Sequence, residues 1–201
     1  MHSIAAGSCE DEVRARLSAG DGPGAAGVLF RALGPEIAGY LAAASRDGEA
    51  AHEAYARTQE AVLKGLPGWD GRASLRTWVY VVARSHLARV RRDEARRARW
   101  WTPLEHHPEA LERSAPRPTT RPSTSRLDEV GRLRALLGPE DREMLVLRIE
   151  RDLPWEAIAR IFLGESVTPE RERREAARLR KRFSAIRERV ARARREARAP
   201  A

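Results

Sequence analysis

The chain has 201 residues, and its 38 Lys and Arg side chains outnumber 29 Asp and Glu side chains, which gives a formal net charge of +9. This length allows one ordinary domain or two small helical domains with modest cores. No apolar run approaches the roughly 18 residues of a membrane span, and the start lacks a secretion signal, so we expect a cytoplasmic protein without membrane insertion. The single cysteine, Cys9, cannot form an internal disulfide, which fits a reducing compartment.

The excess positive charge lies in two blocks. Residues 70–113 carry 10 basic and 6 acidic side chains and residues 165–201 carry 13 and 6, whereas residues 1–69 carry 6 and 9. This asymmetry indicates nucleic acid or an anionic membrane surface as a partner. All basic residues except Lys64 and Lys181 are arginines. A GC-rich coding bias alone can raise the arginine count, so the inference depends on where the arginines lie.

The first half of the chain is expected to contain a tail over residues 1–24 and a helical domain over residues 25–99. Apolar residues recur at helical spacing on both sides of Gly34-Pro35, and this pair predicts the turn of a helical hairpin. A second long helix is predicted to follow Asp47-Gly48 and to end near Leu66.

A third helix is predicted after Ser74, which can act as its N-cap, and is expected to run to about Arg97. We expect its inward residues to be Leu75, Val79, Val82, His86 and Val90. We expect its outward residues to be Arg76, Thr77, Tyr80, Arg84 and Arg91. A ridge suited to duplex phosphates is formed by Arg84, Arg89, Arg91, Arg92, Arg96 and Arg97. Trp78 lies at the boundary, where it can pack in the core or wedge against an unpaired base.

A flexible linker is expected over residues 100–126. Residues 114–126 contain three prolines, six Ser or Thr and no large apolar side chain, so they cannot bury enough surface to fold. The second domain is expected over residues 127–198, where Gly138-Pro139 starts one short helix and Pro154 suits the first turn of the next. No strand-like alternation is present, so the fold should be all-α: two small helical domains, the second a helix-turn-helix.

The most charged stretch predicts one long amphipathic helix. Thr168-Pro169 supplies an N-cap and a proline at the first helical position. Its inward stripe is formed by Leu179, Phe183, Ile186 and Val190, spaced 4, 3 and 4. On the opposite face long cations alternate with small side chains, which would let the backbone approach a DNA groove, although a basic face can also be merely solvated. The residues expected to contact DNA are Arg173, Arg174, Ala177, Arg178, Arg180, Lys181, Arg182, Ser184 and Arg187.

Two stretches of the chain carry motifs of one known family. The stretch LLGPEDREMLVLRIERDLPWEAIARIFLG has a charged helix ending in Leu-x-Leu-Arg, followed by a Glu-x-Ile-Ala helix. The stretch PGWDGRASLRTWVYVVARSHLARVRR has Arg-Thr-Trp leading into a long basic helix. They resemble the C-terminal and N-terminal domains of extracytoplasmic-function sigma factors, and they occur in that family's order. The resemblance covers roughly residues 25–97 and 127–195.

The resemblance implies a subunit that binds RNA polymerase core, recognises the −10 and −35 promoter elements and assists DNA melting. It implies no enzymatic activity, no cofactor and no metal, a location on the nucleoid, and commonly an anti-sigma partner. The −10 and melting residues would be Trp69, Arg72, Ser74, Arg76, Thr77, Trp78, Tyr80, Arg84 and Ser85. The polymerase-binding residues would be Glu49, Glu53, Tyr55, Arg57 and Glu60, and the −35 residues are those of the basic helix given above.

Three positions depart from the family pattern. Gln59-Glu60 falls three residues later than the family's Gln-Glu pair, and Ser85 stands where the family commonly has Asn. Residues 164–174, GESVTPERERR, are longer than the usual short turn, which indicates a divergent branch.

Other function classes have weaker support. His52-Glu53 begins like a zinc-protease motif, but Ala56 stands where the second histidine would be, and no phosphate-binding Gly-x-x-x-x-Gly-Lys is present. Glu105-His106-His107 has no further ligands at metal spacing. An autonomous helix-turn-helix regulator remains the alternative and would need a dimerisation element. A membrane-surface protein would need an apolar stripe exposed beside the cations.

Overall fold

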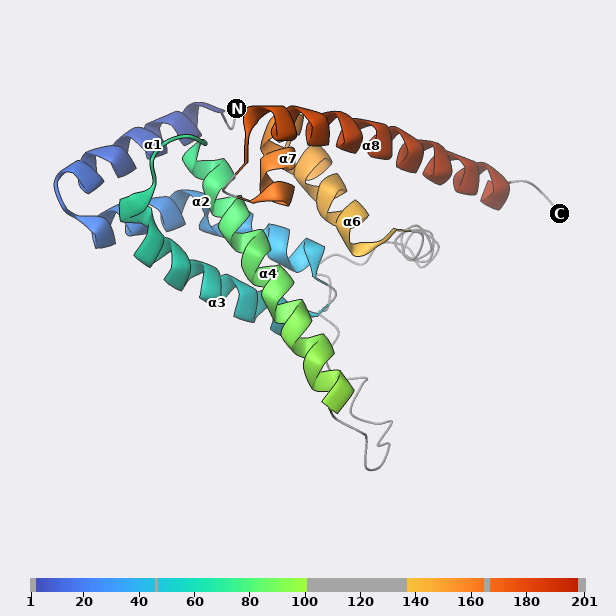
Figure 1. Cartoon of the computed structure of the whole chain (residues 1–201), viewed down its shortest axis with the longest axis horizontal. Helices are drawn as coiled ribbons and strands as arrows, with labels where there is room; N and C mark the ends of the chain where they lie inside the picture. The colour runs from blue at the N-terminus through green and yellow to red at the C-terminus, as the bar shows by residue number, and fades with distance from the viewer. Residues whose placement is uncertain (1–2, 46, 101–136, 165–166, 199–201) are drawn as a thin grey trace.

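The computed structural model describes residues 3–45, 47–100, 137–164 and 167–198. Every regular element in these ranges is a helix, which confirms the all-α prediction. Helices α1 to α4 form an N-terminal unit (residues 3–100), and α6, α7 and α8 belong to a C-terminal unit (residues 137–198), as Figure 1 shows. Apart from Trp100, which ends α4, the predicted linker lies outside the described residues.

Helix α1 (Ser3–Ser18) packs on α2 (Gly22–Ala44), so residues 1–24 contain a packed helix where a tail was expected. The reason is a short apolar stripe, since Cys9, Val13 and Leu17 recur every four residues and Val13 is fully buried. Asp21 then caps α2 by accepting a hydrogen bond from the Gly24 amide at 2.8 Å.

Helix α2 runs without interruption through Pro35, so the predicted hairpin turn at Gly34-Pro35 is wrong. Proline removes one helical hydrogen bond and usually kinks or ends a helix. Here Leu29 and Ile37, before and after the proline, are both fully buried, and that burial outweighs the local cost. Gly34 also allows α2 to lie close to the next helix, because a Cβ there would lie 2.9 Å from the Tyr55 hydroxyl oxygen.

Helices α3 (Gly48–Gly65) and α4 (Leu75–Trp100) are joined through the short 3-10 helix η1 (Leu66–Gly68). The Oγ of Ser74 accepts from the Thr77 amide at 3.2 Å, which confirms the predicted N-cap. Helix α4 contacts α2, α3 and α7, so it is buried around much of its circumference. Its buried residues are Leu75, Thr77, Val79, Tyr80, Val81, Ala83, Leu87 and Val90.

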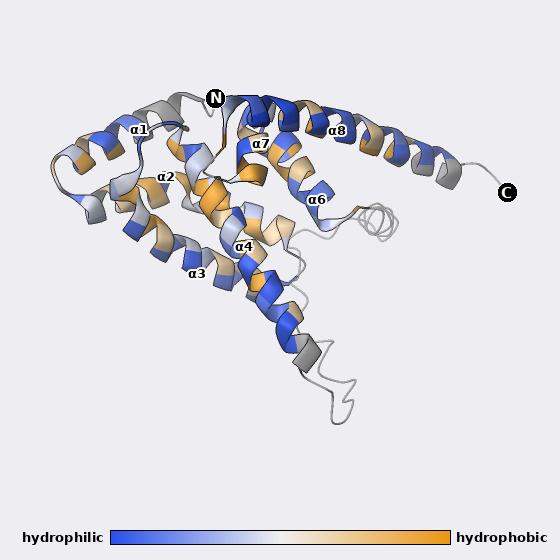
Figure 2. Ribbon diagram, viewed as in Figure 1, coloured by the Kyte–Doolittle hydropathy of each residue, from blue (hydrophilic) through white to orange (hydrophobic). Residues whose placement is uncertain are grey.

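The C-terminal unit consists of α6 (Pro139–Leu145), a π-helix η3 (Val146–Glu150), α7 (Trp155–Leu163) and α8 (Pro169–Arg198). The Thr168 hydroxyl accepts from the Arg171 amide at 3.4 Å, as expected for an N-cap. The inward stripe of α8 is confirmed, with Leu179 and Ile186 buried and Phe183 packed edge-on against Trp155 at 5.3 Å between ring centroids. Figure 2 shows the hydrophilic character of the rest of α8.

The two units share one hydrophobic cluster. Helix α4 packs against α7, and α2 packs against α6 and η3. The C-terminal unit therefore covers one side of α4 instead of standing apart from it, so the predicted separation into two domains is not seen in this arrangement. Within the described ranges, none of the helices combines the length and the apolar character that crossing a lipid bilayer requires.

Candidate nucleic-acid interface

The outer face of α8 is the largest cationic surface that the sequence singled out. The exposed residues on it are Arg173, Arg174, Ala177, Arg178, Arg180, Lys181, Ser184 and Arg187. Arg180 pairs with Glu156 at 2.6 Å, but both side chains are about half exposed, so water screens the pair and either partner can exchange for another. This face therefore presents long cations on both sides of the small side chains of Ala177 and Ser184.

Arg182 is the one predicted α8 contact that turns inward. Its guanidinium donates to Asp141 at 2.5 Å and to Glu140 at 2.9 Å, both on α6. Asp141 is buried and also lies 3.5 Å from Arg189. Arg182 therefore ties α8 to α6, although the resemblance counts it among the −35 contacts. Its position next to the apolar Phe183 places it at the edge of the inward stripe.

Thr77 and Tyr80 of α4 are buried, so the expectation that they face outward is wrong. Tyr80 is fully buried and donates its hydroxyl hydrogen to Oε1 of Glu36 at 2.7 Å. Burial, followed by the neighbouring Glu36 carboxylate, raises the pKa of Tyr80 far above its usual range. The error arose because α2, α3 and α7 all pack against α4, and α2 covers Tyr80 through Tyr40 and Glu36, so the buried face of α4 is wider than a single stripe.

Arg76 and Arg84, also expected to face outward, reach across to the C-terminal unit. Arg76 donates to Glu36 at 2.8 Å and to the main-chain oxygen of Arg151 at 2.8 Å. Arg84 donates to Glu143 at 2.9 Å, and its guanidinium lies 4.2 Å from the centroid of the Phe162 ring. Both are half-buried. Both stand on the predicted surface of α4, but Glu36 and Arg151 cover Arg76, and α6 and α7 cover Arg84.

The remaining −10 candidates lie near the start of α4. Trp69 is half-buried, with its indole donating to the Ala73 oxygen at 3.2 Å and the Arg14 guanidinium 4.4 Å from its ring centroid. Arg72 is exposed and pairs with Asp70 at 3.0 Å. Trp69 is therefore anchored as a packing residue, while Arg72 is accessible to a ligand.

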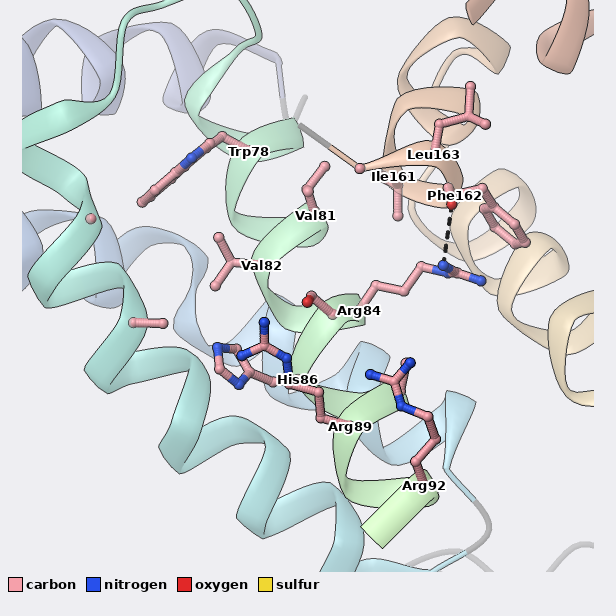
Figure 3. Close-up of a pocket in the computed structure, with 15 residues that line it drawn as sticks. Trp78, Val81, Val82, Arg84, His86, Arg89, Arg92, Ile161, Phe162 and Leu163 are labelled. Carbon is pink, nitrogen blue, oxygen red and sulfur yellow. Dashed lines mark hydrogen bonds between the residues drawn. The ribbon is translucent and has the colours of Figure 1, made fainter. Parts of the chain in front are cut away.

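Two grooves meet at Trp78. The first, about 660 Å³, runs between α3, α4 and the end of α7 and contains Ser85, Arg89 and Arg92, all exposed. Figure 3 shows Arg84 extending from α4 toward Phe162 at one border of this groove. The second, about 240 Å³, continues toward the exposed Arg72. A half-buried aromatic ring beside exposed cations can stack on an unpaired base while the cations contact its backbone.

His86 was expected to face the core from α4, and in the structure its side chain lines the first groove. It is half-buried, and its Nδ1 has no hydrogen-bond partner among the described residues. Burial lowers the pKa of His86, and the cations Arg89 and Arg57 lower it further, while Glu60 opposes them. The groove therefore favours the neutral imidazole.

Four of the predicted polymerase-binding residues share one side of α3, because Glu49, Glu53, Arg57 and Glu60 are spaced 4, 4 and 3 along this helix. Glu49 and Glu60 are exposed, and a hydrogen bond from Lys64 at 2.6 Å lowers the pKa of Glu60. Arg57 bonds Glu53 at 2.6 Å and reaches Asp93 of α4 at 3.3 Å. Tyr55 instead packs edge-on against Phe30 of α2, with 6.5 Å between ring centroids.

Comparison of the chain with protein-family models, curated proteins and solved structures gave no match.

Three residues that the sequence analysis did not predict organise the site: Glu36, Glu143 and Arg160. Arg160 donates to the main-chain oxygen of Arg72 at 2.7 Å, and so borders the second groove. Glu143 carried a usable signal, because it is an acid four residues before the buried Leu147 and hence on the inward row of its helix.

Among the residues that the structure describes, no group of three or more His, Cys, Asp or Glu side chains is placed so that it could hold a metal ion. His52 is exposed and its Nδ1 lies 3.1 Å from the Gly48 oxygen of its own helix. His106 and His107 lie outside the described residues.

Proposed function

We propose that this protein is a sigma-type transcription initiation factor. In this role it binds RNA polymerase core, recognises the −10 and −35 promoter elements and assists opening of the duplex, without covalent chemistry, cofactor or metal. It would act in the cytoplasm on nucleoid DNA, with an anti-sigma factor as a further partner. The motifs in residues 67–92 and 136–164, which occur in the order of the sigma family, support this proposal.

The observation that carries the proposal is the composition of the outer face of α8. Arg174, Arg180 and Lys181 are exposed on it, with the small side chains of Ala177 and Ser184 beside them. Small residues let the helix backbone approach a groove floor, while the long cations reach base edges and phosphates. A helix that was only solvated would have no need for this mixture. Helix α7 packs against α8 and precedes it through a short connection, which is the order of a helix-turn-helix.

The grooves at Trp78 supply a means of opening the duplex. Separating base pairs loses stacking of roughly 1.4 kcal/mol per step. Stacking an unpaired base on an aromatic side chain returns about 1–3 kcal/mol. Trp78 offers such a ring at one end of the first groove, and Arg89 and Arg92 are exposed further along α4 for the strand backbone. In this proposal the groove captures the melted strand, and Ser85 modifies the base preference.

The outer side of α3 is the proposed polymerase contact. Glu49 and Glu60 are its most exposed members, so they offer acidic side chains to a basic partner surface. Glu53 and Arg57 already pair with each other, so we expect them to lie at the edge of the polymerase contact and not at its centre.

A second candidate, an autonomous helix-turn-helix regulator, is favoured by one observation. The N-terminal and C-terminal units share a hydrophobic cluster, as expected for a single DNA-binding body. Such a regulator would bind a palindromic site as a dimer and would need no polymerase.

Reconstitution with bacterial core polymerase separates the two candidates. The full chain is mixed with core and genomic DNA fragments, and new transcription start sites are mapped. The sigma proposal expects core binding and start sites that share upstream sequence elements. Absence of both, together with a footprint of the protein alone on a palindrome, would establish the regulator instead.

A further inference from the structure

We infer that the packing of the C-terminal unit on α4 is an autoinhibitory contact, in which the Glu143 carboxylate occupies arginines that would otherwise hold the DNA backbone. The inference rests on the proposed function, because that role makes Arg84 and Arg91 part of a DNA-binding ridge. In the closed arrangement described above, these two side chains are committed to the protein itself.

Glu143 joins two positions of the ridge with one side chain. Its Oε2 accepts from Nε of Arg84 at 2.9 Å, and its Oε1 accepts from Nη1 of Arg91 at 2.5 Å. The Glu143 side chain is only 3% exposed, while Arg84 and Arg91 are 20% and 30% exposed. A DNA phosphate offers the same chemistry, an anion that accepts several guanidinium hydrogen bonds. Glu143 and a phosphate therefore compete for the same donors.

Main-chain oxygens of the C-terminal unit take up further donors of α4. Arg76 donates to the oxygen of Arg151 at 2.8 Å, and Arg84 reaches the oxygen of Phe162 at 3.4 Å (Figure 3). The Phe162 ring also covers the Arg84 guanidinium. These oxygens take up donors of Arg76 and Arg84, and the Phe162 ring occupies the space that a duplex would need beside Arg84.

The contact covers only one side of the ridge. Arg89 and Arg92 are exposed and line the open groove at Trp78. A duplex can approach these two residues in the closed arrangement, but it cannot reach Arg84 and Arg91 at the same time. Closure therefore weakens DNA binding without abolishing it. Opening frees Arg84 and the Arg91 nitrogen that Glu143 holds, while Arg91 keeps its 2.6 Å hydrogen bond to the Ala44 oxygen of its own unit.

Glu143 serves the contact between the units rather than the fold of its own unit. The hydrogen-bond partners described for it, Arg84 and Arg91, both belong to α4. The core beside it is formed by the apolar Met144 and Leu147, which are fully buried. Burying a carboxylate is favourable only while its cations stay in place, so loss of the charge shifts the balance toward the open arrangement.

The size of the effect follows from the open fraction. A ligand that binds only the open arrangement has an apparent Kd equal to the intrinsic Kd divided by that fraction. Removing the charge of Glu143 raises the fraction and tightens DNA binding. We expect at least about a five-fold gain in affinity, the lower end of typical coupling between two sites.

The test compares Glu143→Gln with wild type and with Glu140→Gln. Glu140 is a matched control, because it lies on the same helix and loses the same charge, but its partner is Arg182 of α8. The radius of gyration of the full chain is measured by small-angle X-ray scattering, and the affinity for a labelled random-sequence duplex is measured by fluorescence anisotropy at constant salt. We expect Glu143→Gln to expand the protein and tighten DNA binding, and Glu140→Gln to do neither.

Arg91→Gln breaks the same pair from the side of α4, together with the Arg91 hydrogen bond to the Ala44 oxygen of its own unit. It should expand the protein as Glu143→Gln does, but it should not tighten DNA binding, because a DNA-binding arginine is removed. If Glu143→Gln disturbs folding, as circular dichroism would reveal, the expansion of Arg91→Gln decides the result. An unchanged radius of gyration, or expansion of Glu143→Gln with unchanged DNA affinity, overturns the inference. If the wild-type protein fails to direct initiation by core polymerase, the proposed function is refuted. The radius of gyration and the DNA affinity of the variants still decide whether the contact between the units is inhibitory.

Discussion

Tyr40 of α2 and Tyr80 of α4 meet edge to face, with ring centroids 5.1 Å apart and an interplanar angle of 70°. Both rings are fully buried, but their hydroxyl groups differ. Tyr80 donates to Glu36 at 2.7 Å, whereas the Tyr40 hydroxyl has no hydrogen-bond partner within the described ranges. Two chemically equal groups thus stabilise the fold to different extents.

Replacing each tyrosine by phenylalanine separates these contributions. Tyr80→Phe should lower the free energy of unfolding by about 1–3 kcal/mol, because it removes a hydrogen bond to a charged group in the interior. Tyr40→Phe should be neutral or stabilising by up to about 1 kcal/mol, because it removes a buried polar atom that lacks a partner. Urea denaturation followed by circular dichroism measures both, and equal losses would contradict this difference.

Arg182 should contribute to stability rather than to DNA binding. Arg182→Ala removes donors to the buried Asp141 and should cost about 1–3 kcal/mol of unfolding free energy. Arg178→Ala is the control, since Arg178 is exposed and its pair with Glu175 spans 3.5 Å, so the change should stay within about 0.5 kcal/mol. A comparable destabilisation by both variants would mean that α8 does not depend on the Asp141 contact.

The outer face of α8 can be tested by its salt dependence. Replacing both Arg180 and Lys181 by alanine should weaken DNA binding and reduce the slope of log K against log salt by about 0.9 for each phosphate that is no longer neutralised. Core polymerase binding should remain as in wild type. Arg192→Ala, an exposed change outside the expected contact stretch, should alter the slope less. A double variant that also fails to bind core would point to misfolding.

His86 should make stability depend on pH. Its pKa lies below the ordinary value in the folded protein, so the unfolded chain takes up a proton first as the pH falls. The stability present above about pH 6.5 is therefore lost as the pH drops toward the lower folded value. His86→Gln should show a smaller fall in Tm than wild type between about pH 7.5 and about pH 5.5. An unchanged fall in His86→Gln would refute the assignment.

Local sequence patterns predicted much of the fold. The N-caps at Ser74 and Thr168, the helix start at Gly138-Pro139 and the inward stripe of α8 are all confirmed. These features depend on a few neighbouring residues and one buried face, so the chain encodes them locally. The break expected at Gly34-Pro35 failed because packing on both sides of the proline overrides local propensity.

The errors in the site have one physical source. Predicting the outward face of α4 assumed that a single side is buried, but α2, α3 and α7 all pack against this helix. Thr77 and Tyr80 therefore turn inward, and Arg76 and Arg84 meet acceptors that lie far away in the sequence. Periodicity identifies which residues share a face, but it does not say how many partners a helix has.

The length of α8 sets a geometric limit on its use. Its 30 residues extend about 45 Å at 1.5 Å per residue. A straight rod of this length exceeds one helical repeat of DNA, about 34 Å, so it cannot follow a groove that winds around the duplex axis. With residues 173–187 seated in the groove, the end that projects past α6 in Figure 1 must leave the double helix at a tangent. The exposed Arg192 and Arg195 would then stand outside the groove that residues 173–187 enter.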